Sequence, residues 1–243
     1  MKITLYFINW NDAFYLPFIK KHYGQFCQRI VMYDNYSTDE SRFLASFLGF
    51  QVREFGIPGK LDDHEYVKVK NNCWKEERRK GIDYVIVCDA DEFVVIPEKL
   101  TASAPVVEGF NMISEDLPKE DIFEITTGAP SVNYSKQAIF NPDRISEINF
   151  VHGCHRNNKV GDITTEEPGC KLFHFRQIGG VDRQIERHSE YRKRLSAFNL
   201  RYKMGSHYGR PEWTSEEIAS FNHSKVLEWN QLKSESNYVS KSF

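Results

Sequence analysis

The first half of the chain alternates between short apolar runs and amphipathic segments, and this alternation limits the fold more than any other feature of the sequence. Strands are predicted at residues 2–9, 29–33, 50–55 and 83–88. Helices are predicted between them at residues 12–23, 37–48 and 63–80. Strands that are joined through helices run parallel, so the pattern predicts an α/β fold with a mainly parallel central sheet and helices on both faces.

The second half has a different character. Residues 97–135 are rich in Pro, Gly and Ser. Further strands are predicted at residues 122–125, 137–140, 144–148 and 171–175, followed by one long helix at 182–202, a short helix at 214–221 and a polar tail. We interpret this half as completing the same sheet and covering the active face, with a helical extension at the C-terminal end.

Composition narrows the class of protein. The chain has 243 residues, of which 40% are hydrophobic, and a formal net charge of −2. These values favour one folded domain and give no general argument for nucleic-acid binding. Its five cysteines form no CxxC pair, so neither a disulfide framework nor a zinc site is indicated. Without a signal peptide or a long apolar segment, we expect a cytoplasmic protein, with peripheral membrane contact left open.

Polar side chains follow three of the predicted parallel strands at the point where each strand ends. Asn9 ends the first strand, Asp34 ends the second, and Asp89 and Asp91 follow the fourth. Ligands bind α/β sheets beyond these carboxyl ends. The acidic cluster at 89–92 is flanked by apolar residues, so its charges need a counter-charge, and Mn²⁺ or Mg²⁺ would supply one.

Two motifs make the function more specific. Residues 33–39 (YDNYSTD) and 87–93 (VCDADEF), in this order and spacing, resemble the family 2 glycosyltransferases of the GT-A fold. The branch of that family with a Leu-Pro-Phe-Ile-like helix start, here residues 16–19, followed by a histidine, here His22, is the closer match. The resemblance covers residues 1–95 and extends more loosely to residue 175.

This resemblance implies roles for individual residues on the donor side. Phe7 and Asn9 would touch the nucleotide of a sugar-nucleotide donor, and Asp34 would meet its base. Asp89 would meet the ribose, or the metal through water, and Asp91 would bind the metal directly. The chain has Asn35 and Tyr36 where many members carry Asp and Gly, which leaves the mode of base recognition open.

Histidine and lysine candidates complete the donor side. Many GT-A enzymes add a later histidine as a metal ligand; His174, in the strand segment KLFHF, is the first choice and His155 the second. Among the lysines before the fourth strand, Lys68 is a candidate for contact with the diphosphate, as are Lys60 and Lys70.

The acceptor side is less defined. An inverting transferase needs a base that takes the proton of the acceptor hydroxyl, and a carboxylate is expected to serve. Glu115 and Asp116 are the first candidates; Asp162, Glu166 and Glu167 are further ones, and a retaining mechanism stays open. The basic segment 182–210 could contact phosphate groups or an anionic membrane surface, or form an ordinary solvated face.

Together these features predict a metal-dependent glycosyltransferase (a hexosyltransferase). It would move a sugar from a UDP- or GDP-linked donor to a hydroxyl of a glycan, a lipid-linked acceptor or a similar molecule, with inversion as the expected outcome. Residues 1–95 would form the donor half, 96–180 the acceptor half and 181–243 a helical segment with a tail. The alternatives are a sugar-nucleotide nucleotidyltransferase or pyrophosphorylase, and a non-catalytic carbohydrate-binding domain.

Overall fold

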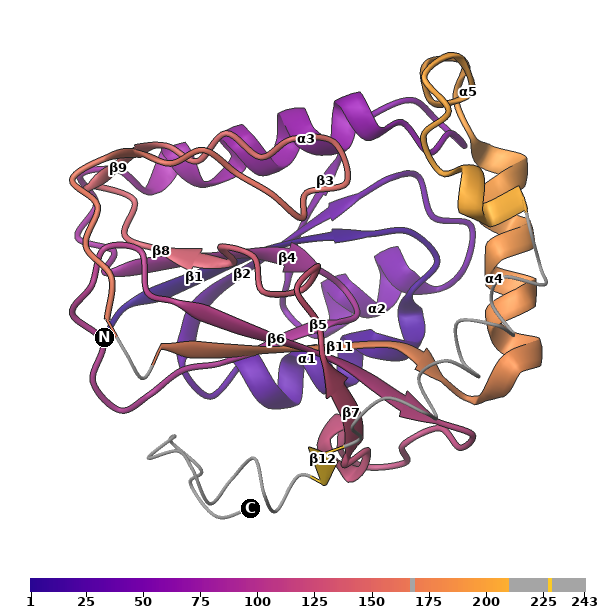
Figure 1. The fold of residues 1–243 in the computed structure, drawn as a ribbon, viewed down its shortest axis with the longest axis horizontal. Coiled ribbons are helices and arrows are strands. Elements are labelled where there is room, and N and C mark those ends of the chain that lie inside the picture. Colours follow the sequence, from indigo (N-terminus) through magenta and orange to yellow (C-terminus); the bar gives the residue numbers. More distant parts are fainter. Residues whose placement is uncertain (167–168, 210–226, 229–243) are drawn as a thin grey trace.

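The computed structural model describes residues 1–166, 169–209 and 227–228. Its first sheet contains β1 (Ile3–Asn9), β2 (Cys27–Asp34), β3 (Gln51–Glu54), β4 (Tyr84–Asp89) and β8 (Ile139–Phe140). The strand order is β3-β2-β1-β4-β8; the first four strands are parallel, and β8 is antiparallel to β4. The parallel arrangement predicted from the β-α alternation is therefore confirmed (Figure 1).

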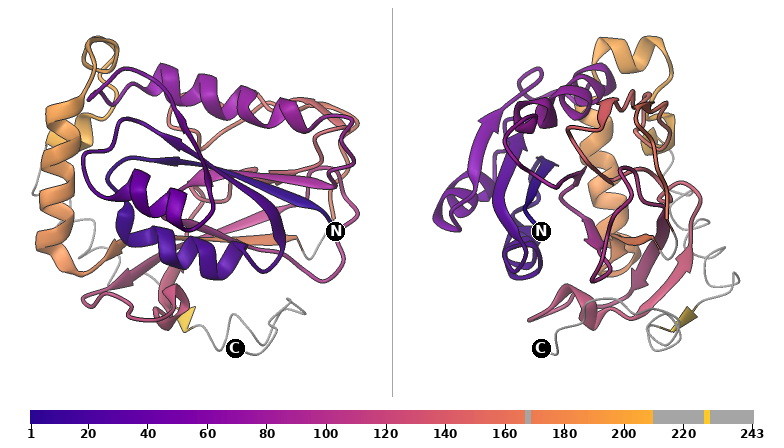
Figure 2. Two further views of the ribbon diagram at one scale, coloured as in Figure 1. Left: turned by 180° about the vertical axis from the view of Figure 1, so that it is seen from behind. Right: turned by 90° about the vertical axis from the view of Figure 1, so that its left-hand side faces the viewer.

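Helices cover both faces of this sheet, as predicted. Helices α1 (Leu16–Tyr23) and α2 (Ser41–Phe47) lie on one face, and α3 (Asp63–Asn72) lies on the other (Figure 2). The alternation of side chains along β1 explains the two layers. Phe7 packs in the core cluster that includes α1, whereas Tyr6 packs with Trp74, which follows α3. The short 3-10 turn η1 (Ala13–Tyr15) leads into α1, and η2 (Cys73–Glu77) follows α3.

The second half does not complete the same sheet, which corrects our interpretation of the sequence. Of its described strands, β8 joins the first sheet; a second sheet has the order β12-β7-β6-β11-β5. Its strands are β5 (Glu92–Val95), β6 (Val107–Ser114), β7 (Thr127–Pro130), β11 (Cys170–Ile178) and β12 (Leu227–Glu228). Strands β9 (Ile145–Glu147) and β10 (Val160–Gly161) form a separate pair.

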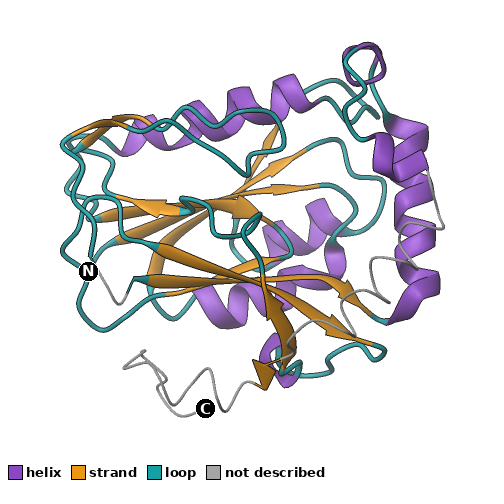
Figure 3. Ribbon diagram, in the orientation of Figure 1, coloured by secondary structure: helices purple, strands orange, loops and turns teal. Residues whose placement is uncertain are grey.

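Several predicted elements differ in detail (Figure 3). The strand predicted at 122–125 is the 3-10 turn η3 (Ile122–Glu124), because Asp121 and Glu124 form a capping box there. The helix predicted at 182–202 is two helices, α4 (Gly180–Arg194) and α5 (Ala197–Arg201); Ser196 caps the second.

The C-terminal part of the chain continues from α5 into the 3-10 turn η4 (Ser206–Gly209). The helix predicted at 214–221 and the polar tail lie outside the described residues. In the part of the chain that the structure describes, no helix is both long enough and apolar enough to cross a membrane. The division at residues 95 and 180 stays a prediction.

A histidine in α1 links the first sheet's helices to β5. The ring of His22 lies among Tyr23, Phe26 and Phe93, and its Nε2 donates to the carbonyl oxygen of Val94 at 2.9 Å. A carbonyl oxygen only accepts, so Nε2 carries the proton of a neutral ring. Burial lowers the pKa of His22 to about 4.

Acid should therefore destabilise the fold through His22. Its folded-state pKa lies below that of an ordinary histidine, so between pH 6.5 and 4 the unfolded chain takes up the proton first and stability falls as the pH falls. We expect this residue to contribute a loss of up to ~3 kcal/mol in the free energy of unfolding. Urea titrations at pH 7 and pH 4 should show a smaller acid loss for His22→Gln, whose amide keeps a donor for Val94. An equal loss in both proteins would contradict the prediction.

Candidate functional site

A cavity of about 540 Å³ opens where the carboxyl ends of β1 and β4 meet the second sheet and α4. The acidic cluster forms its floor. Its walls come from several separate parts of the chain and include Trp10, Asp63, Tyr66, Lys70, Asn111, Tyr134, His155, His174, Arg176, His188, Tyr191 and Tyr208. The sequence prediction of a crevice at the strand ends therefore corresponds to a real cavity.

Two buried lysines neutralise two of the three carboxylates in the acidic cluster. The Nζ of Lys70 lies 2.7 Å from Oδ1 of Asp89, and the Nζ of Lys136 lies 3.6 Å from Oδ2 of the same carboxylate. Lys136 also lies 2.5 Å from Oε1 of Glu92, whose other oxygen accepts from the backbone N–H of Asp89 at 2.9 Å. The counter-charge that the sequence argument assigned to a cation comes here, for Asp89 and Glu92, from the chain itself.

The electrostatics of Asp89 follow from these contacts. Burial alone would raise the pKa of Asp89, but the ammonium groups of Lys70 and Lys136 outweigh it and hold the pKa below its usual value. Burial alone would lower the pKa of Lys70, and Asp89 reverses that effect. Both partners are therefore charged at neutral pH, and Lys70 presents a fixed positive charge to the cavity.

Asp91 has different partners. Its Oδ2 lies 3.1 Å from Nη1 of Arg176 and 3.6 Å from Nε2 of His174. The Nδ1 of His174 lies 2.7 Å from Oδ1 of Asn111, and the Nδ2 of Asn111 donates to Gln177 at 2.8 Å. The amide oxygen accepts from Nδ1–H, so the neutral imidazole turns the lone pair of Nε2 toward Asp91. Burial lowers the pKa of His174, which favours this neutral form.

These two side chains fit a divalent cation. An imidazole lone pair and a carboxylate oxygen face each other at 3.6 Å, and a cation with ligand distances of about 2.1 Å would bind both. The hydrogen bond from Nδ1 to Asn111 fixes the tautomer of His174, as partners of metal-binding histidines commonly do. No group of three or more His, Cys, Asp or Glu side chains suited to a metal occurs among the described residues. The remaining coordination positions would be open to phosphate oxygens or water.

Aromatic rings form the wall beside β1. The rings of Trp10 and Tyr191 have centroids 5.6 Å apart, and Tyr66 and Tyr208 line the same side of the cavity. The guanidinium carbon of Arg194 lies 3.4 Å from the ring centroid of Trp10, and Nη2 donates to Asn35. Within the described part of the chain, Nε and Nη1 of Arg194 have no hydrogen-bond partner.

Three residues predicted to bind the donor lie beneath this wall. Asn9 and Asp34 are fully buried, and Asn9 Nδ2 donates to Asp34 Oδ1 at 3.0 Å. Asp34 also accepts from the hydroxyl and the backbone N–H of Ser37. Phe7 packs on Phe50 in the core. The structure thus brings none of the three to the cavity surface; Ile8 and Trp10, on the opposite side of β1, line it instead.

The structure favours a different lysine from the first candidate. Lys68 is exposed and lies 3.6 Å from Glu65, whereas Lys70 is 3% exposed and lines the cavity. Residues two positions apart lie on nearly opposite sides of a helix. Lys70 therefore replaces Lys68 as the lysine placed to meet an anionic ligand.

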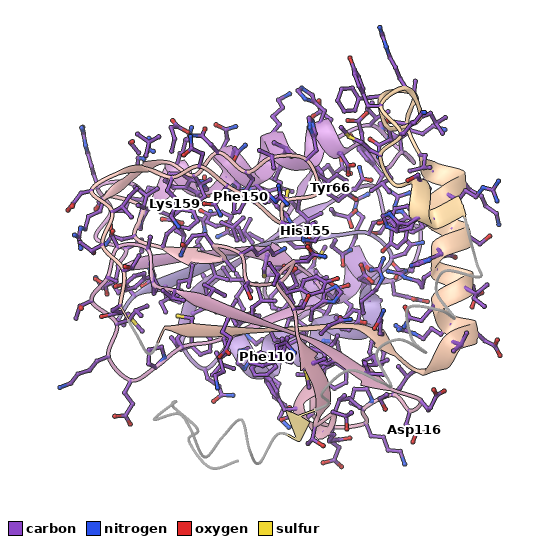
Figure 4. The ribbon with its side chains drawn as sticks, in the orientation of Figure 1. Tyr66, Phe110, Asp116, Phe150, His155 and Lys159 are labelled. Carbon is purple, nitrogen blue, oxygen red and sulfur yellow. The ribbon has the colours of Figure 1, made fainter. Side chains whose placement is uncertain are left out.

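The carboxylates predicted as catalytic bases lie away from the cavity. Glu115 and Asp116 are exposed in the loop after β6, and Figure 4 shows Asp116 at the edge of the molecule, well apart from His155. Asp162 pairs with Arg144 at 2.8 Å, and Glu166 accepts from Thr101. Glu167 lies outside the described residues.

His155 does line the cavity, as expected of a site residue, although not beside the Asp91–His174 pair. Its Nδ1 lies 2.9 Å from the carbonyl oxygen of Asn133, and its ring packs edge-on to Tyr134 at 5.8 Å. Because no three metal-binding side chains gather among the described residues, the predicted set of Asp91, His174 and His155 does not form in this structure.

The basic segment divides between two environments. Arg187 and Arg194 face inward: Arg187 pairs with Asp12 and lies 5.8 Å from the ring of Trp10. Arg192 and Lys193 face solvent. The inward arginines pack against Trp10 of the aromatic wall and do not face a membrane; contact of the exposed ones with a membrane stays a prediction. Arg210 lies outside the described residues.

Sequence reasoning missed Lys136, Asn111 and Arg176. Arg176 is two residues from His174, so the alternation of side chains along β11 could have indicated that both face one ligand. Asn111 and Lys136 come from β6 and from the segment before β8. Their relation to the acidic cluster depends on pairing between distant strands, for which a single sequence carries no local signal.

Comparisons with known proteins add little to this geometry. No family model matches the chain, and no curated protein matches it. Among solved structures it is similar to glucosyl-3-phosphoglycerate synthase from Mycobacterium tuberculosis, in a complex with Mn²⁺, UDP and glucosyl-3-phosphoglycerate. The identity is 16%, the TM-score is 0.26, and the alignment covers 38% of this chain and 34% of that one. So short an overlap carries no argument, and the function has to be inferred from the site.

The buried lysine at the cluster gives a stability prediction. Lys136→Met would leave Glu92 buried without its counter-charge, and we expect it to lower the free energy of unfolding by ~3 kcal/mol or more. The double variant Glu92→Gln with Lys136→Met removes both charges, while the amide oxygen can still accept from Asp89. Urea denaturation should show the double variant to be more stable than Lys136→Met alone. The reverse order would contradict the ion-pair assignment.

Proposed function

We propose that this chain is a metal-dependent glycosyltransferase that uses a nucleoside diphosphate sugar as its donor. The opposed pair of Asp91 Oδ2 and a neutral His174 Nε2 at 3.6 Å is the observation that carries the proposal. Lys70 adds a positive charge beside this pair, in a cavity large enough for a nucleotide sugar. The resemblance of residues 33–39 and 87–93 to family 2 glycosyltransferases supports the same conclusion.

The donor's diphosphate would bind between the metal pair and Lys70. When bound, Mn²⁺ or Mg²⁺ would stabilise the charge that develops on the departing diphosphate. Lys70 would donate to a phosphate oxygen from a position that Asp89 holds fixed, at no cost of reorganisation. Arg176, held against Asp91, would keep that carboxylate in place.

The base and ribose would lie against the aromatic wall. Trp10 and Tyr66 offer flat faces for stacking. Arg194 lies over Trp10 with two buried nitrogens that lack partners in the described part of the chain. The N–H groups of the guanidinium are donors, which suits the carbonyl oxygens that uracil and guanine both carry. UDP- and GDP-sugars are accordingly the donors we propose.

The two alternatives make different demands on the site. A pyrophosphorylase needs a loop after β1 that cradles a triphosphate, but here Asn11 is held by Ser37 and Thr38. A non-catalytic carbohydrate-binding domain has no use for a buried lysine and a metal-binding pair on one cavity floor. Both would fail the same assay: neither should hydrolyse a nucleotide sugar in the presence of Mn²⁺.

Asp91→Asn tests the metal assignment directly. The amide keeps the shape of the side chain and removes its charge, so we expect metal-dependent donor turnover to be lost while the fold is retained. In a thermal-shift screen, a true donor should raise the melting temperature of the wild type only together with Mn²⁺, and should not raise that of the variant. Glu186→Gln, on the exposed side of α4, is the control and should behave as the wild type. Full turnover in Asp91→Asn would refute the assignment.

Asn111 provides a second test of the same pair. Asn111→Leu removes the acceptor that fixes the His174 tautomer, so Mn²⁺ should bind about 10- to 100-fold more weakly. Titration of free Mn²⁺ by electron paramagnetic resonance measures this affinity without a donor. Gln177→Leu removes only the outer amide and should have a smaller effect. An unchanged affinity in Asn111→Leu would argue against His174 as a ligand.

A further inference from the structure

We propose that His155 is the general base that takes the proton of the acceptor hydroxyl, an inference that rests on the proposed glycosyl transfer. Its Nδ1 lies 2.9 Å from the carbonyl oxygen of Asn133. A carbonyl oxygen only accepts, so Nδ1 carries a hydrogen, and the lone pair of the imidazole form is on Nε2. The residue lines the cavity, so this lone pair is available to a molecule bound there.

The ring of Tyr134 lies between His155 and His174 of the metal-binding pair. One side of Tyr134 stacks on His174, with centroids 3.8 Å apart and planes at 18°. The same ring meets His155 edge-on, at 5.8 Å and 78°. His155 is thus one aromatic ring away from the residue that would hold the donor's diphosphate through the metal, which is where an acceptor must approach the sugar.

The backbone holds this imidazole in place. Gly153 and Cys154 both have positive φ angles, 80° and 56°. The positive φ of Cys154 is unusual for a residue with a side chain, and such a conformation persists only where the surrounding structure enforces it. Here the Cys154 side chain is buried, and its N–H donates to the carbonyl oxygen of Val151 at 2.8 Å. The turn thereby points residue 155 into the cavity.

The carboxylates that line the cavity are less suited to this role. Asp12 is paired with Arg187, Asp89 with two lysines and Glu92 with Lys136. Asp63 remains, at the start of α3, but it lies seven residues before Lys70. At 1.5 Å per residue this is about 10 Å along the helix from the lysine that meets Asp89.

Proton transfer to His155 accompanies the attack on the sugar. Nε2 of His155 takes the proton of the acceptor hydroxyl as its oxygen forms a bond to the anomeric carbon of the sugar. The bond from that carbon to the diphosphate oxygen breaks, and the nucleoside diphosphate leaves with the electron pair. The imidazolium then returns its proton to solvent. Attack from the side opposite the leaving group inverts the anomeric configuration.

The test uses water as the acceptor, because it needs no knowledge of the natural one. The donor is the UDP- or GDP-sugar that gives the largest Mn²⁺-dependent thermal shift with the wild type. Release of nucleoside diphosphate is measured for the wild type, His155→Ala and His155→Gln; the glutamine can still donate to Asn133. Arg156→Ala, at the exposed next position, is the matched control. The anomer of the released sugar is followed by proton NMR.

We expect both His155 variants to keep the donor-induced thermal shift and to lose hydrolysis by about 100-fold or more. Added imidazole should restore part of the rate of His155→Ala, an effect that a merely structural role would not produce. Arg156→Ala should retain the wild-type rate, and the wild type should release the inverted anomer. Wild-type turnover in the His155 variants, failure of imidazole rescue or retention of configuration would each overturn the inference. A wild type that binds no donor with Mn²⁺ would instead overturn the proposed function.

Discussion

The passage of the chain from one sheet to the other between Asp89 and Glu92 is the constraint on which the site depends. Strand β4 ends parallel to β1 in the first sheet, and β5 begins antiparallel to β11 in the second. The crossing places three carboxylates between two apolar layers, where each charge needs a partner. Lys70 and Lys136 meet that requirement for two of them, and Arg176 meets it for Asp91, which also faces the neutral imidazole of His174.

This division of the cluster separates structural from chemical roles. Asp89 and Glu92 are bound to lysines and anchor the crossing, although Asp89 also fixes Lys70 at the cavity floor. Arg176 holds Asp91 and Asn111 holds His174, and these contacts leave the Asp91 carboxylate and the Nε2 of His174 able to bind a cation. A motif that looks like one group of acids in the sequence is, in three dimensions, an ion-pair network next to a candidate metal site.

The sequence predicted the elements that local patterns control. The β-α alternation predicted β1 to β4 and the crevice at their ends, and the position of His174 in an apolar strand placed it near the cluster. The direction of side chains was harder to predict from the sequence. Phe7 and Asn9 were predicted to meet the donor, but their neighbours Ile8 and Trp10 line the cavity. Likewise Lys70 lines the cavity in place of Lys68. The positions of Glu115 and Asp116 depended on strand pairing in the second sheet, and that of Lys136 on the pairing of β8 with β4 in the first; one sequence does not encode such pairing locally.

The contacts between the C-terminal helices and α3 affect the order in which the protein folds. The chain from α4 to α5 is tied to the start of α3: Leu61 donates to the carbonyl of Arg194, and Asp63 donates to Asn199 across 136 positions of the chain. Closing so long a loop is entropically costly and slow compared with forming the first sheet. The sheet and its acidic cluster should therefore form early, whereas the aromatic wall is completed only when the last described helices dock. During synthesis the polypeptide would carry its carboxylates well before it encloses a binding site.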